Sequence, residues 1–129
     1  MRVLLISPNA DVRKSMALAV RSVQRSLGEP LEFLEAVDGL EGIALAWRYL
    51  PEVVVADEIA SRAGAFAVAR ELKGAAPPFP GRVVILLDRT QDEWLASWSG
   101  ADAWFVKPFN PFEVADTMGG FVGGSKEAV

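Results

Sequence analysis

The sequence predicts an α/β protein in which helices cover both faces of one parallel sheet, and three observations support this prediction. Short apolar runs alternate five times with longer segments of helical spacing. Two of these runs, residues 53–56 and 83–87, are apolar at every position, which is typical of strands that are buried on both faces of a parallel sheet. The length of 129 residues suits one domain with a substantial core.

The composition narrows the classes of function. The net charge of −4 argues against a general binder of nucleic acid or of anionic membranes, because both need a basic surface. The chain has no Cys and no His, which removes disulfides, thiolate chemistry and the usual general base. We therefore expect neither an enzyme nor a bound cofactor. The apolar run at residues 3–6 is too short for a signal peptide or a membrane span, so the expected location is cytoplasmic.

The first half of the chain is predicted to form a strand, a helix, a strand, a helix and a strand, over residues 3–6, 11–27, 31–36, 38–49 and 53–56. Asn9 or Asp11 is a suitable cap for the first helix. The second strand alternates apolar and polar residues, which predicts that one of its faces is less buried. Asp38, with Glu41 three residues later, has the spacing of a helix start, and Pro51 ends that helix.

The second half is predicted to form a helix, a strand, a helix, a strand and a helix, over residues 64–73, 83–87, 90–99, 101–106 and 110–122. Thr90 and Glu93 have the spacing of a capping box, and Asn110 is a suitable cap for the last helix. Two pairs of glycines weaken the end of that helix. We therefore expect one domain over residues 1–122 and a frayed tail over residues 123–129.

Strands that alternate with helices favour right-handed crossovers and a flavodoxin-like, doubly wound sheet with strand order 2-1-3-4-5. In such a sheet, ligands bind at the carboxyl ends of the strands. The residues that follow strands one, three, four and five are gathered there: Ser7, Asp57, Leu87 with Asp88, and Lys107. Asp57 and Lys107 are expected to face each other. Two simpler interpretations stay open: Asp57 as a turn residue or helix cap, and an exposed salt bridge worth about 1 kcal/mol or less.

Two segments carry a resemblance to a known family. They are Pro51-Glu52-Val53-Val54-Val55-Ala56-Asp57 and Gly100-Ala101-Asp102-Ala103-Trp104-Phe105-Val106-Lys107-Pro108-Phe109. Together with the five strand–helix units, they resemble the receiver (response-regulator, chemotaxis-receiver-like) domains of two-component signalling, over about residues 2–121. The resemblance implies that Asp57 is the phosphoacceptor, that Lys107 contacts the phosphoryl group, and that the bond between Lys107 and Pro108 is cis.

The sequence departs from this family at several site positions. Ser7 and Pro8 stand where the family has an acidic pair that holds Mg²⁺, a cation that prefers carboxylate oxygens. Asp57, backbone carbonyls and the Asn9 amide are then the remaining candidate ligands. Leu87 replaces a Ser or Thr hydroxyl that binds the phosphoryl group and cannot donate a hydrogen bond. Trp104 replaces a smaller switch aromatic, and the family's proline in the loop after the phosphoacceptor corresponds to Ser61.

These departures favour an atypical or pseudo-receiver that acts through protein–protein contacts without Mg²⁺-dependent phosphorylation. Leu95 and Trp98 are candidates for an exposed partner surface, with burial of both in the core as the open alternative, whereas Trp94 is assigned to the core. The expected partners are proteins such as a histidine kinase or an output protein, and a homodimer is an open possibility.

The alternative hypothesis is a working receiver that a histidine kinase phosphorylates on Asp57, with Mg²⁺ as cofactor. Asp57 and Lys107 favour it, whereas Ser7, Pro8 and Leu87 oppose it. Asp88 adds a negative charge that would oppose a phosphoryl group, or else supplies a replacement ligand. Flavin binding is disfavoured because residues 7–14 contain no glycine for a phosphate loop.

Overall fold

The computed structural model describes residues 1–22, 30–59 and 63–127 of the chain. Within them, five parallel strands form one sheet in the order β2-β1-β3-β4-β5. Their bounds are Arg2–Ile6 (β1), Glu32–Ala36 (β2), Val53–Asp57 (β3), Arg82–Leu87 (β4) and Ala103–Val106 (β5). The predicted fold class and strand order are confirmed.

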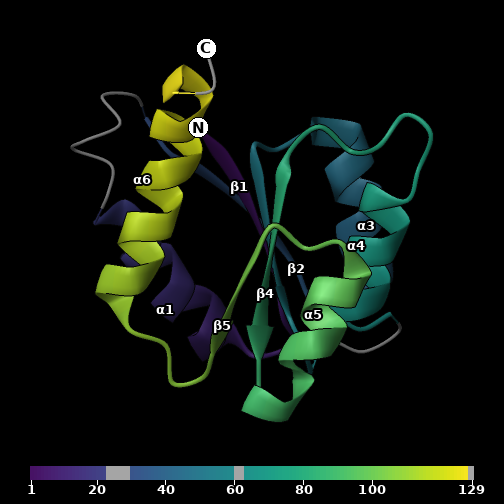
Figure 1. The fold of residues 1–129 in the computed structure, drawn as a ribbon, viewed down its shortest axis with the longest axis horizontal. Helices are drawn as coiled ribbons and strands as arrows, with labels where there is room; N and C mark the ends of the chain where they lie inside the picture. Colours follow the sequence, from purple (N-terminus) through teal and green to yellow (C-terminus); the bar gives the residue numbers. More distant parts are fainter. Residues whose placement is uncertain (23–29, 60–62, 128–129) are drawn as a thin grey trace.

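Helices cover both faces of the sheet (Figure 1). Their bounds are Ala10–Arg21 (α1), Gly39–Tyr49 (α3), Ala65–Lys73 (α4), Glu93–Ser99 (α5), preceded by a 3₁₀ turn (η1) over Thr90–Asp92, and Pro111–Glu127 (α6). One face carries α1 and α6, and the other carries α3, α4 and α5. The predicted end of the first helix falls within residues 23–29, which lie outside the described part. Helix α6 extends into the segment that the glycine pairs were expected to fray.

Short polar side chains begin three of the helices. The side chain of Asn9 accepts hydrogen bonds from the backbone N–H groups of Asp11 and Val12, so Asn9 is the cap of α1. Asp38 caps α3 by accepting from the N–H of Glu41, and Asn110 accepts from the N–H of Phe112 at the start of α6. These three predicted caps are confirmed.

The predicted capping box between Thr90 and Glu93 is wrong. Thr90 begins a 3₁₀ turn, and neither that turn nor α5 has a side-chain cap among the described residues. The carboxylate of Glu93 instead accepts a hydrogen bond from the indole Nε1 of Trp104, at 3.0 Å. The Glu93 carboxylate therefore bonds to Trp104 on β5, whereas a capping box would have used it at the start of its own helix.

The core lies in two layers, one on each face of the sheet, and the central strands contribute to both because successive side chains point to opposite faces. All five residues of β3 are buried. Phe79, from the loop after α4, fills the layer under α3, where its ring packs edge-on against Trp47 with the ring centroids 5.6 Å apart. No helix in the described ranges is long and apolar enough to cross a membrane.

The assignment of Trp94 to the core is wrong, because 66% of this residue is exposed. Helix α5 buries Ala96 and Ser99 against the rest of the domain. Trp94 and Trp98 are four residues apart and therefore share the opposite face of the helix. A helix of seven residues that packs through small side chains leaves its large ones in solvent.

Candidate functional site

The carboxyl edge of the sheet brings together four of the residues named from the sequence. Ser7 follows β1, Asp57 ends β3, Asp88 follows β4 and Lys107 follows β5. Parallel strands in register place these ends side by side, and Asp57 pairs with Leu86 on the neighbouring strand. The interpretation of Asp57 as a simple turn residue is therefore incomplete, since its side chain lies among the other strand ends.

Asp57 is buried and bound through both carboxylate oxygens. Its side chain has 0% exposure to solvent. The Nζ of Lys107 lies 2.6 Å from Oδ1, and the hydroxyl of Ser7 donates to Oδ2 at 2.8 Å. The backbone N–H of Ile59 makes a longer contact of 3.4 Å to Oδ1. The negative charge of Asp57 is thus stabilised by one ammonium and two neutral donors.

Lys107 joins two carboxylates, because its Nζ also lies 2.9 Å from Oδ1 of Asp88. Burial by itself would lower the pKa of Lys107, but the hydrogen bonds and charges of Asp57 and Asp88 outweigh it and raise the pKa above its ordinary value. Lys107 is therefore a fixed cation. The three groups together carry one net negative charge.

A second set of charged residues lies next to this triad. Glu58, directly after Asp57, accepts a hydrogen bond from the backbone N–H of Asp88 at 2.6 Å. Burial and a hydrogen bond with Asp92 raise the pKa of Glu58. The bond with Glu58 and the ion pair with Arg89 lower the pKa of Asp92. Sequence reasoning missed this cluster, although the position of Glu58 beside Asp57 is a signal that could have found it.

The other site positions lie in different surroundings. Pro8 is exposed beside the site. Leu87 is fully buried in the core layer under α3, α4 and α5, so its position provides packing and no donor. Trp104 packs against the same layer and donates to Glu93. Ser61 lies outside the described residues. The bond between Lys107 and Pro108 is cis.

The groups around Asp57 fit Mg²⁺ poorly. This ion needs several oxygen ligands in a nearly octahedral arrangement. Ser7 donates its proton to Asp57, and the Asn9 side-chain oxygen is occupied by two backbone N–H groups of α1. In the described part of the chain, no three acidic side chains come together in a way that could hold a metal ion. The Asn9 amide is therefore not a free replacement ligand.

The candidate partner residues lie on α5. Trp98 is 58% exposed, and the guanidinium of Arg70 on α4 lies over its ring, 4.3 Å from the ring centroid. Leu95 is only partly exposed. Trp94, which the sequence analysis placed in the core, stands beside Trp98. We call Trp94, Trp98 and Arg70 the tryptophan face.

The chain is similar to known proteins in sequence and in fold. No family model matches the chain. An uncharacterized response regulatory protein of Mycobacterium tuberculosis strain H37Rv is 27% identical over 118 residues, which cover 92% of this chain and 88% of that protein. The same figures hold for the uncharacterized response regulatory protein of strain CDC 1551.

Solved receiver domains have the same fold. The signal receiver domain of a DNA-binding response regulator from Colwellia psychrerythraea gives a TM-score of 0.82 at 17% identity, covering 95% of this chain and 98% of that one. The receiver domain of a sensor histidine kinase from Pseudomonas aeruginosa, which has a magnesium ion coordinated in its active-site cleft, gives 0.78 at 16% identity, covering 95% and 97%. The chain is thus similar in sequence to response regulatory proteins over 92% of its length, and it has the fold of solved receiver domains.

Proposed function

We propose that this receiver domain signals by binding a protein partner and does not depend on Mg²⁺-assisted phosphorylation of Asp57. The observation that carries the proposal is the arrangement around Asp57. Ser7 and Lys107 occupy the two oxygens of a carboxylate that is itself shielded from solvent. Asp57 and Lys107 then form a fixed structural pair at the edge where other receivers carry out phosphoryl transfer.

Phosphoryl transfer needs positive charge around the three equatorial oxygens of the transferred group. Lys107 is the cation in contact with Asp57 in the described site, and it is already shared with Asp88. A phosphoryl group on Asp57 would add negative charge next to the Asp88 carboxylate. Leu87 cannot contribute a hydrogen bond from the neighbouring strand. Each of these features raises the barrier to transfer and lowers the stability of the product.

The tryptophan face is the proposed partner surface. Tryptophan and arginine are the residue types that most often dominate binding energy at protein interfaces. Trp94 and Trp98 expose large apolar rings on one face of α5, and the guanidinium of Arg70 lies over the ring of Trp98. The partner is a protein of a two-component pathway, either a histidine kinase or an output protein.

The alternative, phosphorylation of Asp57 by a histidine kinase, is favoured by one observation. Asp57 and Lys107 make the direct contact that the family's phosphoacceptor and lysine are expected to make.

A fluorine NMR titration with Mg²⁺ and beryllofluoride distinguishes the proposed function from this alternative. We expect no bound beryllofluoride signal with the natural chain. The Ser7→Asp/Pro8→Asp variant restores the acidic pair and is expected to gain Mg²⁺ binding and the adduct. A saturable adduct on the natural chain would overturn the proposal.

The partner surface has its own test. A photo-cross-linking residue at Ser97, which is exposed between the two tryptophans, is expected to capture a two-component protein in cells. The same residue at Leu18, on the opposite side of the sheet, is the control. Capture that persists when Trp98→Ala and Trp94→Ser are added would exclude the tryptophan face as the binding surface.

A further inference from the structure

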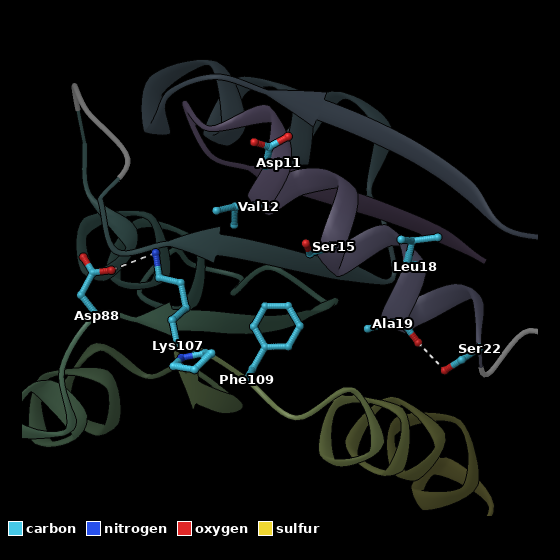
Figure 2. A pocket seen from close by; sticks show the side chains of 10 residues that line it. Asp11, Val12, Ser15, Leu18, Ala19, Ser22, Asp88, Lys107 and Phe109 are labelled. Carbon is cyan, nitrogen blue, oxygen red and sulfur yellow. Dashed lines mark hydrogen bonds and ion pairs between the residues drawn. The ribbon is translucent and has the colours of Figure 1, made fainter.

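A groove of about 830 Å³ runs along α1, on the side of the sheet opposite the tryptophan face. Figure 2 shows it between α1 and the segment that follows β5, with the ring of Phe109 across from Val12 and Ser15. This volume is within the range of small-molecule sites in proteins. Apart from Asp88 and Lys107 at one end, the residues that line the groove have no part in the site around Asp57.

The body of the groove is apolar. Val12 and Ala19 form its wall on α1, and Phe109 with Pro108 forms the opposite wall. Leu18, near the far end, is 59% exposed although it is a large aliphatic residue. An organic group that covers these side chains would remove apolar surface from water, which stabilises binding in proportion to the area covered.

The charges lie toward the other end of the groove. Asp88 and Lys107 line that end, and Asp11 lines the groove from the first turn of α1 (Figure 2). The ammonium of Lys107 is already held by two carboxylates, those of Asp57 and Asp88. Asp11 adds a further carboxylate to the lining, so the charged residues of the groove, Asp11, Asp88 and Lys107, carry one net negative charge.

An anionic ligand finds little support here. The first backbone N–H groups of α1, which would be the natural donors to an anion, are occupied by the side chain of Asn9. A carboxylate near Lys107 would also approach the Asp88 carboxylate, which lies 2.9 Å from the ammonium. A cation meets the opposite situation, because Asp11 is exposed and has no ion pair with another described residue, and the Asp88 side chain is 40% exposed.

We propose that this groove binds a small amphipathic cation, an amine with an aromatic or branched aliphatic body. The ammonium lies at the acidic end, near Asp11 and Asp88, and the body packs between Val12, Ala19 and Phe109. The ligand would contact Phe109, which directly follows the cis-bonded Pro108, and Lys107, which pairs with Asp57. A ligand in the groove would therefore touch residues at the edge of the Asp57 site, and it would make no contact with the tryptophan face.

The test uses two probes of the same shape and opposite charge, 2-(1-naphthyl)ethylamine and 1-naphthylacetate, with the full chain observed by amide NMR. We expect the amine to shift the resonances of Val12, Ser15 and Phe109 in a saturable way, and the acid to bind several times more weakly. The Asp11→Asn variant should weaken the amine by about two- to fivefold, as expected for an exposed ion pair, and leave the acid unchanged or tighter.

Asp116→Asn removes an exposed carboxylate of α6 that does not line the groove and serves as the matched control. It should change neither affinity. The proposal is overturned by equal or tighter binding of the acid, by amine binding that Asp11→Asn does not weaken, or by amine-induced shifts that are confined to the tryptophan face. The experiment needs no phosphodonor and no partner, so it can fail while the proposed function holds.

Discussion

The Nζ of Lys107 lies 2.6 Å from Oδ1 of Asp57, whose side chain is completely shielded from solvent, while 20% of the Lys107 side chain remains exposed. Because of this difference in exposure, losing Lys107 and losing Asp57 are expected to cost different amounts of folding free energy. Asp57 has Lys107 as its ion-pair partner among the described residues, whereas Lys107 also has Asp88. Removing the cation therefore costs more than removing the anion.

The first prediction concerns this inequality. Lys107→Met should lower the free energy of unfolding by about 2–4 kcal/mol, because a buried carboxylate loses its counter-charge. Asp57→Asn should cost clearly less, because Lys107 keeps Asp88 and water. Urea unfolding followed by circular dichroism measures both. The double variant Asp57→Asn/Lys107→Met should recover part of the stability that Lys107→Met loses. An equal loss of stability in the two single variants would contradict the claim that removing the cation costs more than removing the anion.

The second prediction concerns Glu58. Burial and Asp92 raise the pKa of its folded-state carboxyl above the ordinary value of 4.5, so the folded chain binds a proton more readily than the unfolded chain. Ionised Glu58 therefore costs stability above its folded pKa, and this cost disappears as the pH falls through the raised pKa toward 4.5. The lowered pKa of Asp92 acts in the opposite direction, because its contribution is present at neutral pH and is lost in acid.

Glu58→Gln separates these two effects. Glutamine keeps an oxygen for the N–H of Asp88 and supplies a neutral donor to Asp92. We expect the variant to be more stable than the natural chain at pH 7, by no more than about 1 kcal/mol because Glu58 is only partly buried. The advantage should shrink as the pH falls through the raised pKa of Glu58 and should be absent below about 4.5. Thermal unfolding across this range measures it, and an advantage that does not depend on pH would rule out the titration of Glu58 as the cause.

The third prediction concerns the contact between Trp104 and Glu93. The indole N–H donates to the carboxylate at 3.0 Å and ties β5 to α5. Glu93→Ala should shift the Trp104 indole resonance upfield in an amide NMR spectrum and cost about 0.5–1 kcal/mol. Glu93→Gln keeps an acceptor oxygen and should shift it less. An unchanged indole resonance in the alanine variant would mean that this hydrogen bond does not persist in solution.

The fourth prediction concerns the tryptophan face. Because the ring of Trp94 is mostly in solvent, Trp94→Ser should change the free energy of unfolding by no more than about 0.5 kcal/mol. Trp98→Ala also loses the contact with Arg70 and should cost about 0.5–1 kcal/mol more. Val68→Ala, a fully buried position on α4, is the comparison for a true core residue and should cost clearly more than either. A loss at Trp94 as large as that at Val68 would place the ring in the core.

Much of the fold could be predicted because its signals are local. An uninterrupted apolar run such as residues 53–56 fits few structures other than a buried parallel strand, and caps such as Asn9 and Asp38 act within one helical turn. The convergence of Asp57 and Lys107 also followed, because parallel strands joined by right-handed crossovers place their carboxyl ends at one edge. Their direct contact confirms that expectation.

Other features depend on which groups meet in space. Helix α5 has apolar side chains on several sides, so its sequence does not show which face packs inward, and Trp94 was misplaced for that reason. The capping box failed because Trp104 reaches the Glu93 carboxylate from another element. The sequence by itself determined the alternation of strands and helices, the strand order and the edge that holds Asp57 and Lys107, because these follow from periodicity and chain topology. Only the tertiary structure decided the second bond of Lys107 to Asp88, the hydrogen-bonded pair of Glu58 and Asp92, the exposed tryptophans and the groove beside α1. Each of these depends on how different elements pack together, and the free energy of that packing depends on distances that no local pattern encodes.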